Sequence, residues 1–254
     1  MYTPCVSDSK PLNRSSARRC PLCLSEETTL FFTSTQKNLE RDYYHCEDCD
    51  LVFVPPEFHL DPEAEKARYL THNNDPNDVD YRAFLARLWD ELRPRLTVGV
   101  HGLDYGAGPG PALAAMIEEA GFSVALYDPF FHPNTAALSI SYDFITCTET
   151  VEHFSSPRTD FVRLHELLKP GGWLGVMTGV LKDKINFADW YYQRDPTHVA
   201  FYSEGTLRWV ADWLRWEVEF PRANIALFQK PDGGRSEQGL SVFSNCHSEA
   251  LRGI

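Results

Sequence analysis

Four cysteines near the N-terminus are spaced as metal ligands. Cys20 and Cys23 form one Cys-x-x-Cys pair, and Cys46 and Cys49 form a second pair after a segment of hairpin length. Each such turn directs two thiolates at one point, and two turns make the tetrahedral set of four sulfurs that zinc prefers. The spacing predicts a structural zinc site, because four protein ligands leave no open position for a substrate. Four metal-free thiols and a redox pair are the alternatives.

A glycine-rich turn and an aspartate form a second group of candidate residues. The turn, LDYGAGPG, covers residues 103–110, follows a β-prone segment and opens a predicted helix. Its glycines let the backbone approach a ligand closely, and the N–H groups at the start of the helix suit a carboxylate. Asp128 ends the next predicted strand, where a carboxylate can accept hydrogen bonds from both ribose hydroxyls. The pattern predicts a nucleotide-binding site, and an ordinary turn beside a surface aspartate is the alternative.

The glycine turn lies within a regular alternation of strands and helices. The predicted strands cover residues 98–106, 123–128, 143–148, 173–178, 216–220 and 225–229. The predicted helices cover residues 111–120, 161–168 and 203–213. This alternation predicts a Rossmann-like α/β fold, in which helices cover both faces of a mostly parallel sheet. The last two strands are separated by a short turn, and we expect them to form a C-terminal antiparallel hairpin.

A smaller module precedes this domain. Short β-prone segments alternate with the cysteine pairs, and Pro55-Pro56 ends the last of them. Two helices are predicted next, at 61–72 and 79–93, and the second carries an apolar stripe that should pack on the following domain. The predicted organisation is a flexible leader (1–18), a zinc-ribbon-like module (19–56), a helical linker (57–96), the α/β domain (97–230) and a flexible tail (231–254).

Composition and charge limit the class of partner. The 254 residues are 43% hydrophobic and carry a formal net charge of −12. An acidic surface repels phosphate backbones, so a long nucleic acid is not the expected partner. The sequence has neither a run of apolar residues long enough to span a membrane nor the apolar core of a secretory signal. The odd total of seven cysteines, four of them in paired turns, favours metal binding in a reducing cytoplasm.

Taken together, the motifs resemble those of class I S-adenosylmethionine (SAM)-dependent methyltransferases. LDYGAGPG resembles the first glycine motif of that family, and YDPF, at 127–130, resembles its ribose-binding acidic motif. DFITCTETVEHF, at 143–154, resembles the fourth-strand motif of the quinone- and small-molecule-methylating branch. LLKPGGWLGVMT, at 167–178, resembles the conserved turn and fifth strand. The CPLC…CEDC module is similar to the zinc module of some bacterial methyltransferases, including sugar C-methyltransferases and one 23S rRNA guanine methyltransferase group.

The resemblance implies SAM as cofactor and a set of residues that bind it. The glycine turn would line the methionine part, Asp104 would orient the amino group, and Asp128 would hold the ribose. Thr148 and Glu149, at the tip of the fourth strand, would face the cofactor or the substrate. The full implied set is Asp104, Gly106, Ala107, Gly108, Gly110, Asp128, Pro129, Thr148 and Glu149. An NAD-dependent oxidoreductase shares the glycine turn, but the preceding acidic residue and the Lys-Pro-Gly-Gly turn favour SAM.

The chain departs from this family after Asp128. Only fifteen residues separate Asp128 from Phe144, where the family usually fits a helix and another strand. The third strand is therefore predicted to be short or absent, and the acidic residue that contacts adenine stays unassigned.

Two histidines are candidates for a general base. Methyl transfer is an in-line displacement, so a base is needed only when the acceptor must lose a proton. His153 follows the fourth strand, and His198 lies between the fifth strand and the next helix, where this superfamily usually carries substrate contacts. We favour His198 for that reason. A loop-ordering hydrogen bond for His153 and simple burial of His198 are the alternatives.

An aromatic run, Trp190-Tyr191-Tyr192, lies upstream of His198. It could line an acceptor pocket or contact the sulfonium through cation–π interactions, and ordinary packing is the alternative. The expected function is transfer of a methyl group from SAM to a small-molecule oxygen, nitrogen or carbon. An RNA methyltransferase that grips RNA with its zinc ribbon and a non-catalytic zinc- or SAM-binding scaffold are the competing hypotheses.

Overall fold

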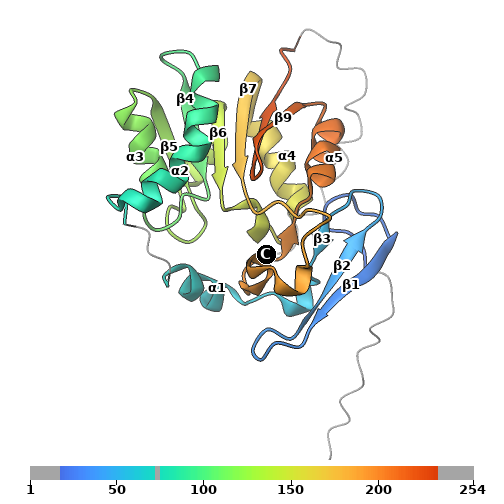
Figure 1. Cartoon of the computed structure of the whole chain (residues 1–254). Coiled ribbons are helices and arrows are strands. Elements are labelled where there is room, and N and C mark those ends of the chain that lie inside the picture. Colours follow the sequence, from blue (N-terminus) through green and yellow to red (C-terminus); the bar gives the residue numbers. More distant parts are fainter. Residues whose placement is uncertain (1–17, 72–74, 234–254) are drawn as a thin grey trace, which may run out of the picture.

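The computed structural model describes residues 18–71 and 75–233. Its strands form two sheets (Figure 1). The predicted leader up to residue 17 and the predicted tail from residue 234 lie outside the described residues. The large sheet has the order β5-β4-β6-β7-β10-β9, and the small sheet has the order β1-β2-β3-β8. None of the helices in the described ranges is long and apolar enough to cross a membrane.

The large sheet confirms the predicted α/β architecture. Its parallel part consists of β4 (His101–Tyr105), β5 (Ser123–Tyr127), β6 (Tyr142–Thr148) and β7 (Leu168–Met177). The strands β9 (Glu217–Arg222) and β10 (Ile225–Gln229) form the expected hairpin, which adds to β7 in the antiparallel direction. The fold is therefore Rossmann-like, with a mostly parallel sheet that ends in an antiparallel pair.

Alternation along the central strands explains why helices cover both faces of this sheet. In β6, Phe144 packs with α2 (Val79–Leu92) and α3 (Ala112–Glu119), whereas Ile145 packs with α4 (Pro157–Leu167) and α5 (Glu204–Leu214). Successive side chains of a strand point to opposite faces, so a strand that is apolar at every position requires cover on both sides. The apolar stripe of α2 packs on this domain as predicted, and Leu88 and Leu92 are fully buried.

The prediction that the third strand, after β5, is short or absent is confirmed. Residues 129–141 are all described, and they contain a 3-10 turn, Thr135–Ser139, and an isolated bridge from Asp128 to His132. No strand forms there, so β5 is the edge of the large sheet. A turn closed by the bridge from Asp128 to His132 follows this edge strand, in place of another strand.

The largest differences from the predicted boundaries are at the starts of α4 and β7. The helix α4 begins at Pro157, a turn before the predicted start, because its apolar stripe only begins at Phe161. The strand β7 begins at Leu168 and includes the Lys-Pro-Gly-Gly segment that we expected to be a turn. A register shift in the pairing of β6 with β7 accommodates these residues, and Gly171 has a positive φ of 75°.

The small sheet combines three strands from the N-terminal part of the chain with one strand from the large domain. The strands β1 (Thr28–Ser34), β2 (Arg41–Cys46) and β3 (Val52–Phe53) form the predicted N-terminal module. The sequence did not indicate β8 (Ala200–Phe201), which comes from the large domain and pairs with β3. The helix α1 (Pro62–Tyr69), capped by Asp61, then leads toward α2. The module is thus continuous with the segment that precedes α5.

Candidate active site

A cavity of about 820 Å³ opens at the carboxyl ends of β4, β5 and β6. The last residues of these strands, Tyr105, Tyr127 and Thr148, line it together with the glycine turn. In open α/β sheets, ligands bind at this edge of the sheet. The remaining walls come from α1, α2, α4, the segments 128–131 and 149–155, and the segment 191–198. The volume lies within the range of sites for small molecules and cofactors.

The glycine turn takes a conformation that requires glycine. Gly106 and Gly108 have positive φ angles of 83° and 64°. A Cβ atom on Gly106 would lie 2.3 Å from the side chain of Thr150, whereas one on Gly108 would meet nothing within 4 Å. The first glycine therefore allows close packing beneath the turn, and the second leaves open space above it, where a ligand can approach the backbone.

Asp128 ties this turn to the end of β5. Its Oδ2 accepts a hydrogen bond from the amide of Gly108 at 3.0 Å, and its Oδ1 accepts from the amides of Phe130 and Phe131 at 2.8 and 3.0 Å. Only 7% of its surface is exposed. Three backbone donors thus fix a carboxylate at the mouth of the glycine turn, and its remaining lone pairs stay available to a ligand.

Asp104 lies below the cavity rather than on its wall. It is 4% exposed and accepts a hydrogen bond from Thr146 Oγ1 at 2.8 Å. Burial raises its pKa to about 6. Neither Asp104 nor Gly110 is among the residues that line the cavity, whereas Gly106, Ala107, Gly108, Asp128, Pro129, Thr148 and Glu149 all line it.

The tip of β6 presents two polar side chains to the cavity. Thr148 Oγ1 is buried and has no hydrogen-bond partner among the described residues, which suits a site completed by a ligand. Glu149 has a left-handed backbone with a φ of 48°, and its amide donates to the carbonyl of Met177 at 2.8 Å. Such a conformation costs energy in a residue with a side chain, and it persists here because the neighbouring strand holds it.

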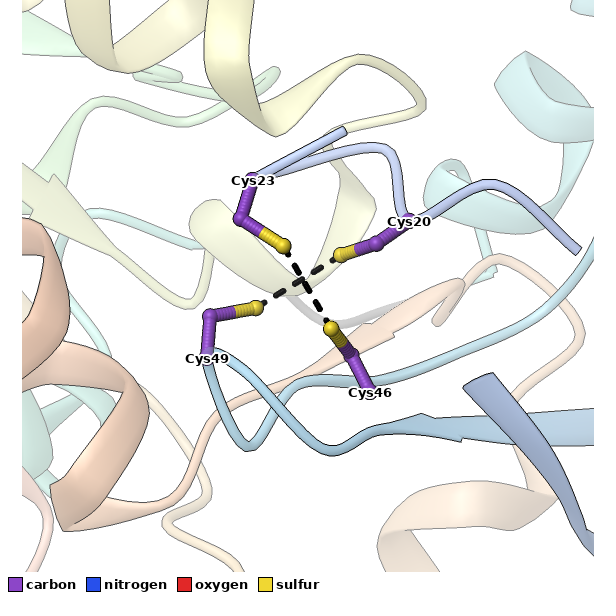
Figure 2. Close-up of side chains that lie close together, drawn as sticks. All are labelled: Cys20, Cys23, Cys46 and Cys49. Atoms are coloured by element: carbon purple, nitrogen blue, oxygen red, sulfur yellow. Dashed lines mark hydrogen bonds between the residues drawn. The ribbon is translucent and has the colours of Figure 1, made fainter. Parts of the chain in front are cut away.

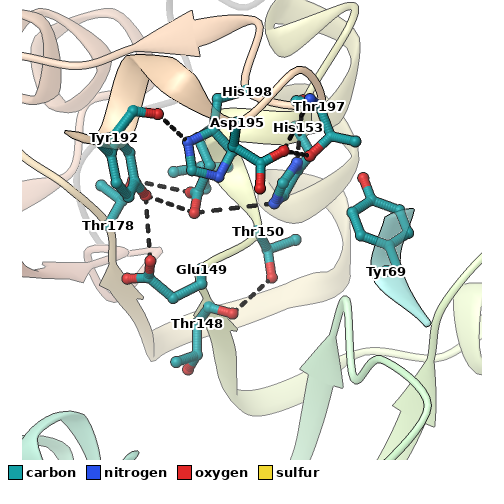
Figure 3. Close-up of polar contacts among 12 residues, drawn as sticks. Tyr69, Thr148, Glu149, Thr150, His153, Thr178, Tyr192, Asp195, Thr197 and His198 are labelled. Atoms are coloured by element: carbon teal, nitrogen blue, oxygen red, sulfur yellow. Dashed lines mark hydrogen bonds and ion pairs between the residues drawn. The ribbon is translucent and has the colours of Figure 1, made fainter. Parts of the chain in front are cut away.

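Tyr192 links Glu149 to a second, fully buried carboxylate (Figure 3). Its hydroxyl lies 2.5 Å from Glu152 Oε1 and 3.3 Å from Glu149 Oε2. Thr178 Oγ1 donates to the other oxygen, Oε2, of Glu152 at 2.8 Å. Both oxygens of Glu152 therefore have neutral hydrogen-bond donors. Burial, followed by the negative charge of Glu152, raises the pKa of Glu149 to about 9, so Glu149 is protonated at neutral pH.

The two candidate histidines lie side by side on the cavity wall (Figure 3). His153 Nδ1 lies 3.1 Å from the carbonyl of Thr197, and His198 Nδ1 lies 2.7 Å from the carbonyl of Tyr192. A carbonyl can only accept, so each Nδ1 carries a proton, and His198, whose ring is neutral, keeps a lone pair on Nε2. The structure thus brings together the two histidines that the sequence offered as candidate bases.

Burial and a nearby carboxylate shape the surroundings of the two histidines. Burial, and then the neighbouring His153, lower the pKa of His198 to about 4, which keeps that ring neutral at physiological pH. The ligand atoms of Glu152, His153 and His198 lie within 4.8 Å of one another, a spacing that could admit a cation. Both oxygens of Glu152 also accept hydrogen bonds from buried hydroxyls.

Several residues that complete the site were not found from the sequence. Arg68 binds Asp195 with two nitrogens, at 3.1 and 2.7 Å, and both side chains line the cavity. Burial alone would raise the pKa of Asp195, but the hydrogen bonds from Arg68 and Thr197 bring it well below its usual range. Arg68 lies on a helix without an apolar stripe, so no local pattern marked it. In the aromatic run, Tyr191 and Tyr192 line the cavity, whereas Trp190 packs against Phe187 and Phe201.

The four N-terminal cysteines converge as their spacing predicts (Figure 2). The Sγ atoms of Cys20 and Cys49 are 3.5 Å apart, those of Cys23 and Cys46 are 3.3 Å apart, and all four lie within 4.8 Å of one another. Sulfurs 2.3 Å from a tetrahedral zinc are separated by roughly 3.8 Å, so these distances fit that geometry after a slight expansion. Cys20, Cys46 and Cys49 are buried. Cys147 lies in the core of β6, and burial raises its pKa well above the usual value, as expected for an inert thiol.

Comparison with known proteins identifies the large domain. Residues 77–218 match the family described as a methyltransferase domain. Similar solved structures include an O-methyltransferase family protein from Burkholderia thailandensis, with 14% identity, a TM-score of 0.45, and coverage of 70% of this chain and 62% of that chain. A SAM-dependent methyltransferase from Archaeoglobus fulgidus has 17% identity, a TM-score of 0.45, and coverage of 58% and 93%, respectively.

A third similar structure is that of CalO1, a methyltransferase in calicheamicin biosynthesis, in a form with S-adenosylhomocysteine (SAH) bound. It has 14% identity and a TM-score of 0.42, and the match covers 58% of this chain and 52% of that chain. The match thus spans less than two thirds of the length of two of these three proteins. Among curated proteins, no match was found.

We expect Glu149→Gln to stabilise the protein at mildly alkaline pH. The raised pKa, from 4.5 to about 9, means that the folded state holds a proton that the unfolded state has lost, so stability falls as the pH rises through this window. Glutamine resembles the protonated acid and removes that loss. Thermal unfolding midpoints should therefore be higher for the variant at alkaline pH and equal to wild type below pH 4.5.

The exposed Glu217→Gln, on β9, serves as the matched control and should show no such pH-dependent difference. Equal midpoints for Glu149→Gln and wild type at every pH would mean that Glu149 is ionised in the folded protein.

Proposed function

Because the chain belongs to the class I SAM-dependent methyltransferases, as the match over residues 77–218 establishes, we propose that its cavity transfers the methyl group of SAM to a small-molecule acceptor. One observation carries this proposal. The glycine turn with Asp128, here called the cofactor end, and the two histidines, here called the histidine end, line the same cavity. A cofactor and an acceptor can therefore meet within a single enclosure.

The residues of the cofactor end fit SAM. The carboxylate of Asp128 would accept hydrogen bonds from the ribose hydroxyls, because three backbone amides already hold it in place. The open space above Gly108 would admit the methionine part against the backbone. The unpartnered Thr148 hydroxyl would bond a polar atom of the bound cofactor or acceptor. Asp104 would act from below, by fixing the strand end through Thr146.

The histidine end would receive the acceptor. Bound SAM supplies a methyl group on a sulfonium, which a nucleophile attacks in line. His198 Nε2 would take the proton that the acceptor loses, because its Nδ1 donates to the carbonyl of Tyr192 and the ring is neutral. The carboxylate of Glu152 supplies negative charge that would stabilise a proton on either histidine. Its Oε1 lies 4.0 Å from His153 Nε2, and its charge also acts on His198. His153 is the second candidate for the same step.

Several observations favour a small molecule over RNA. Aromatic and apolar side chains enclose the cavity, among them Tyr69, Phe84, Phe130 and Tyr191. The net charge of −12 opposes association with a phosphate backbone. Arg68, a cation at the cavity, is held by Asp195.

The four converging cysteines support structural zinc. Three of them are buried between the strands of the module and the core around α5, so an ion there would join the module to the large domain. Four protein ligands leave no position for a substrate, so the ion would stabilise the fold without taking part in the reaction.

Asp128→Ala should weaken the binding of SAM and of SAH by about 1–3 kcal/mol, since it removes a charged acceptor from the ribose site. Isothermal titration calorimetry measures this change directly. Asp90→Ala, which alters an exposed carboxylate of α2, should leave both affinities unchanged. If Asp128→Ala bound SAH as tightly as wild type, the ribose would lie elsewhere.

A labelling experiment separates the two classes of acceptor. The protein is incubated with tritiated-methyl SAM and either the small-molecule fraction of a cell extract or total RNA. We expect label in the small-molecule fraction, and we expect His198→Ala to slow its transfer by about 100-fold while SAM affinity stays normal. The surface variant His101→Ala should behave as wild type. Label in RNA would reverse the assignment of acceptor, and full activity of His198→Ala would remove it as the base.

Metal analysis tests the zinc proposal. The purified chain should contain one zinc per molecule, and Cys46→Ser should lose that metal and unfold at lower temperature, because metal binding contributes folding energy. Cys147→Ala, which changes a core thiol outside the cluster, should keep the full zinc content. Metal-free wild-type protein with unchanged thermal stability would contradict the proposal.

A further inference from the structure

The backbone between Tyr192 and His198 turns several carbonyl groups toward the N-terminal module. The carbonyl oxygens of Gln193, Asp195 and Pro196 all accept from one side chain, although Gln193 lies in the 3-10 turn Tyr191–Arg194 and the other two follow it. Three carbonyl dipoles that converge in the protein interior repel one another, and a buried donor must satisfy each of them. The same segment carries His198, whose amide donates to the carbonyl of Asp195.

A single arginine of the module satisfies all three carbonyls. Arg41, on β2, donates from Nη1 to Pro196 at 3.0 Å and from Nη2 to Gln193 and Asp195 at 2.8 and 2.9 Å. Its Nε donates to the hydroxyl of Tyr43 at 2.8 Å, and that hydroxyl lies within hydrogen-bond distance of both oxygens of Gln193. Arg41 is 3% exposed. The rigid fork of a guanidinium matches three acceptors in different directions, which an ammonium cannot do.

These contacts bear directly on the histidine end of the cavity. The carbonyl oxygen of Asp195 accepts from both Arg41 Nη2 and the amide of His198, at 2.9 and 3.2 Å. On the other side of the segment, the side chain of Asp195 binds Arg68 and Thr197, and the carbonyl of Thr197 accepts from His153 Nδ1. The segment that positions both histidines is therefore held between one arginine of α1 and one arginine of the module.

We propose that Arg41 is a positioning residue for methyl transfer: from the N-terminal module, it holds the 192–198 segment so that His153 and His198 face the acceptor. The inference rests on the proposed function for the role of these histidines. It gives the module a part in the reaction that differs from metal binding. Arg41 begins β2, whereas the metal ligand Cys46 ends the same strand. The hydrogen bonds of Arg41 do not include the glycine turn or Asp128, so the binding of SAH should not depend on Arg41.

The test compares Arg41→Met and Arg41→Lys with wild type, using the full chain loaded with zinc. Hydrogen exchange measured by mass spectrometry should show amides within 192–199 exchanging about tenfold faster or more in Arg41→Met, since three buried carbonyls lose their donors. NMR titration should show the pKa of His198 rising from about 4 toward its ordinary value as the segment loosens and water enters. Arg41→Lys should lie between wild type and Arg41→Met.

The affinity for SAH, measured by calorimetry, should stay within about twofold of wild type in both variants, because the cofactor end is untouched. Lys37→Met removes an exposed positive charge from the same module and should change none of these properties. If Arg41→Met does not fold, Arg41→Lys decides through the same measurements.

Two results would overturn the inference. Unchanged exchange within 192–199 and an unchanged titration of His198 would mean that the segment holds its shape without Arg41. Faster exchange throughout the chain, together with loss of SAH binding, would reduce Arg41 to a general contribution to stability. Failure of wild-type protein to bind SAH would instead contradict the proposed function, and the exchange data would still report on the segment.

Discussion

The hydrogen bond from the amide of Gly108 to the carboxylate of Asp128 is the constraint on which the site depends. It joins the turn after β4 to the end of β5, at 3.0 Å, and its donor, Gly108, has a positive φ of 64°. The short segment after Asp128 contributes the amides of Phe130 and Phe131, so the missing third strand also serves the site: its place is taken by a tight turn that holds the carboxylate. The same carboxylate is thereby oriented before any ligand arrives, which lowers the ordering cost of binding.

Much of the fold followed from local patterns. The two cysteine pairs, the glycine turn and Asp128 are short motifs that residue type and spacing reveal, and each lies in the predicted context. The strands β5 and β10 were recognisable because they are apolar at nearly every position, as sheets covered on both faces require, and β4 and β6 because of the motifs that they carry. The shortage of chain after Asp128 could be counted, so the absence of a third strand was also predictable.

The features that were missed depend on distant parts of the chain. Arg41 lies between Glu40 and Asp42, a charged cluster that is typical of a surface, and only carbonyls more than 150 residues away explain its burial. The strand β8 has two residues and forms because β3 is there to pair with it. The contact of Asp104 with Thr146, which the pairing of β4 with β6 creates, was likewise not visible in the sequence. Patterns along the chain do not contain these contacts.

The two ends of the cavity are consequently built in different ways. The cofactor end is made by strand ends and backbone amides of the large sheet, which a Rossmann-like fold supplies by itself. The histidine end is made by an irregular segment between β7 and α5, whose carbonyls need donors from the module and from α1. This division suggests why the small sheet includes β8: the strand anchors the end of the same segment to the module.

A crystal structure of the chain with SAH would test the central claim most directly. The account predicts SAH in the cavity at the carboxyl ends of β4 to β6, with both ribose hydroxyls within hydrogen-bond distance of the Asp128 carboxylate and the Gly108 amide still bound to it. SAH found elsewhere, or a ribose that makes no contact with Asp128, would contradict it.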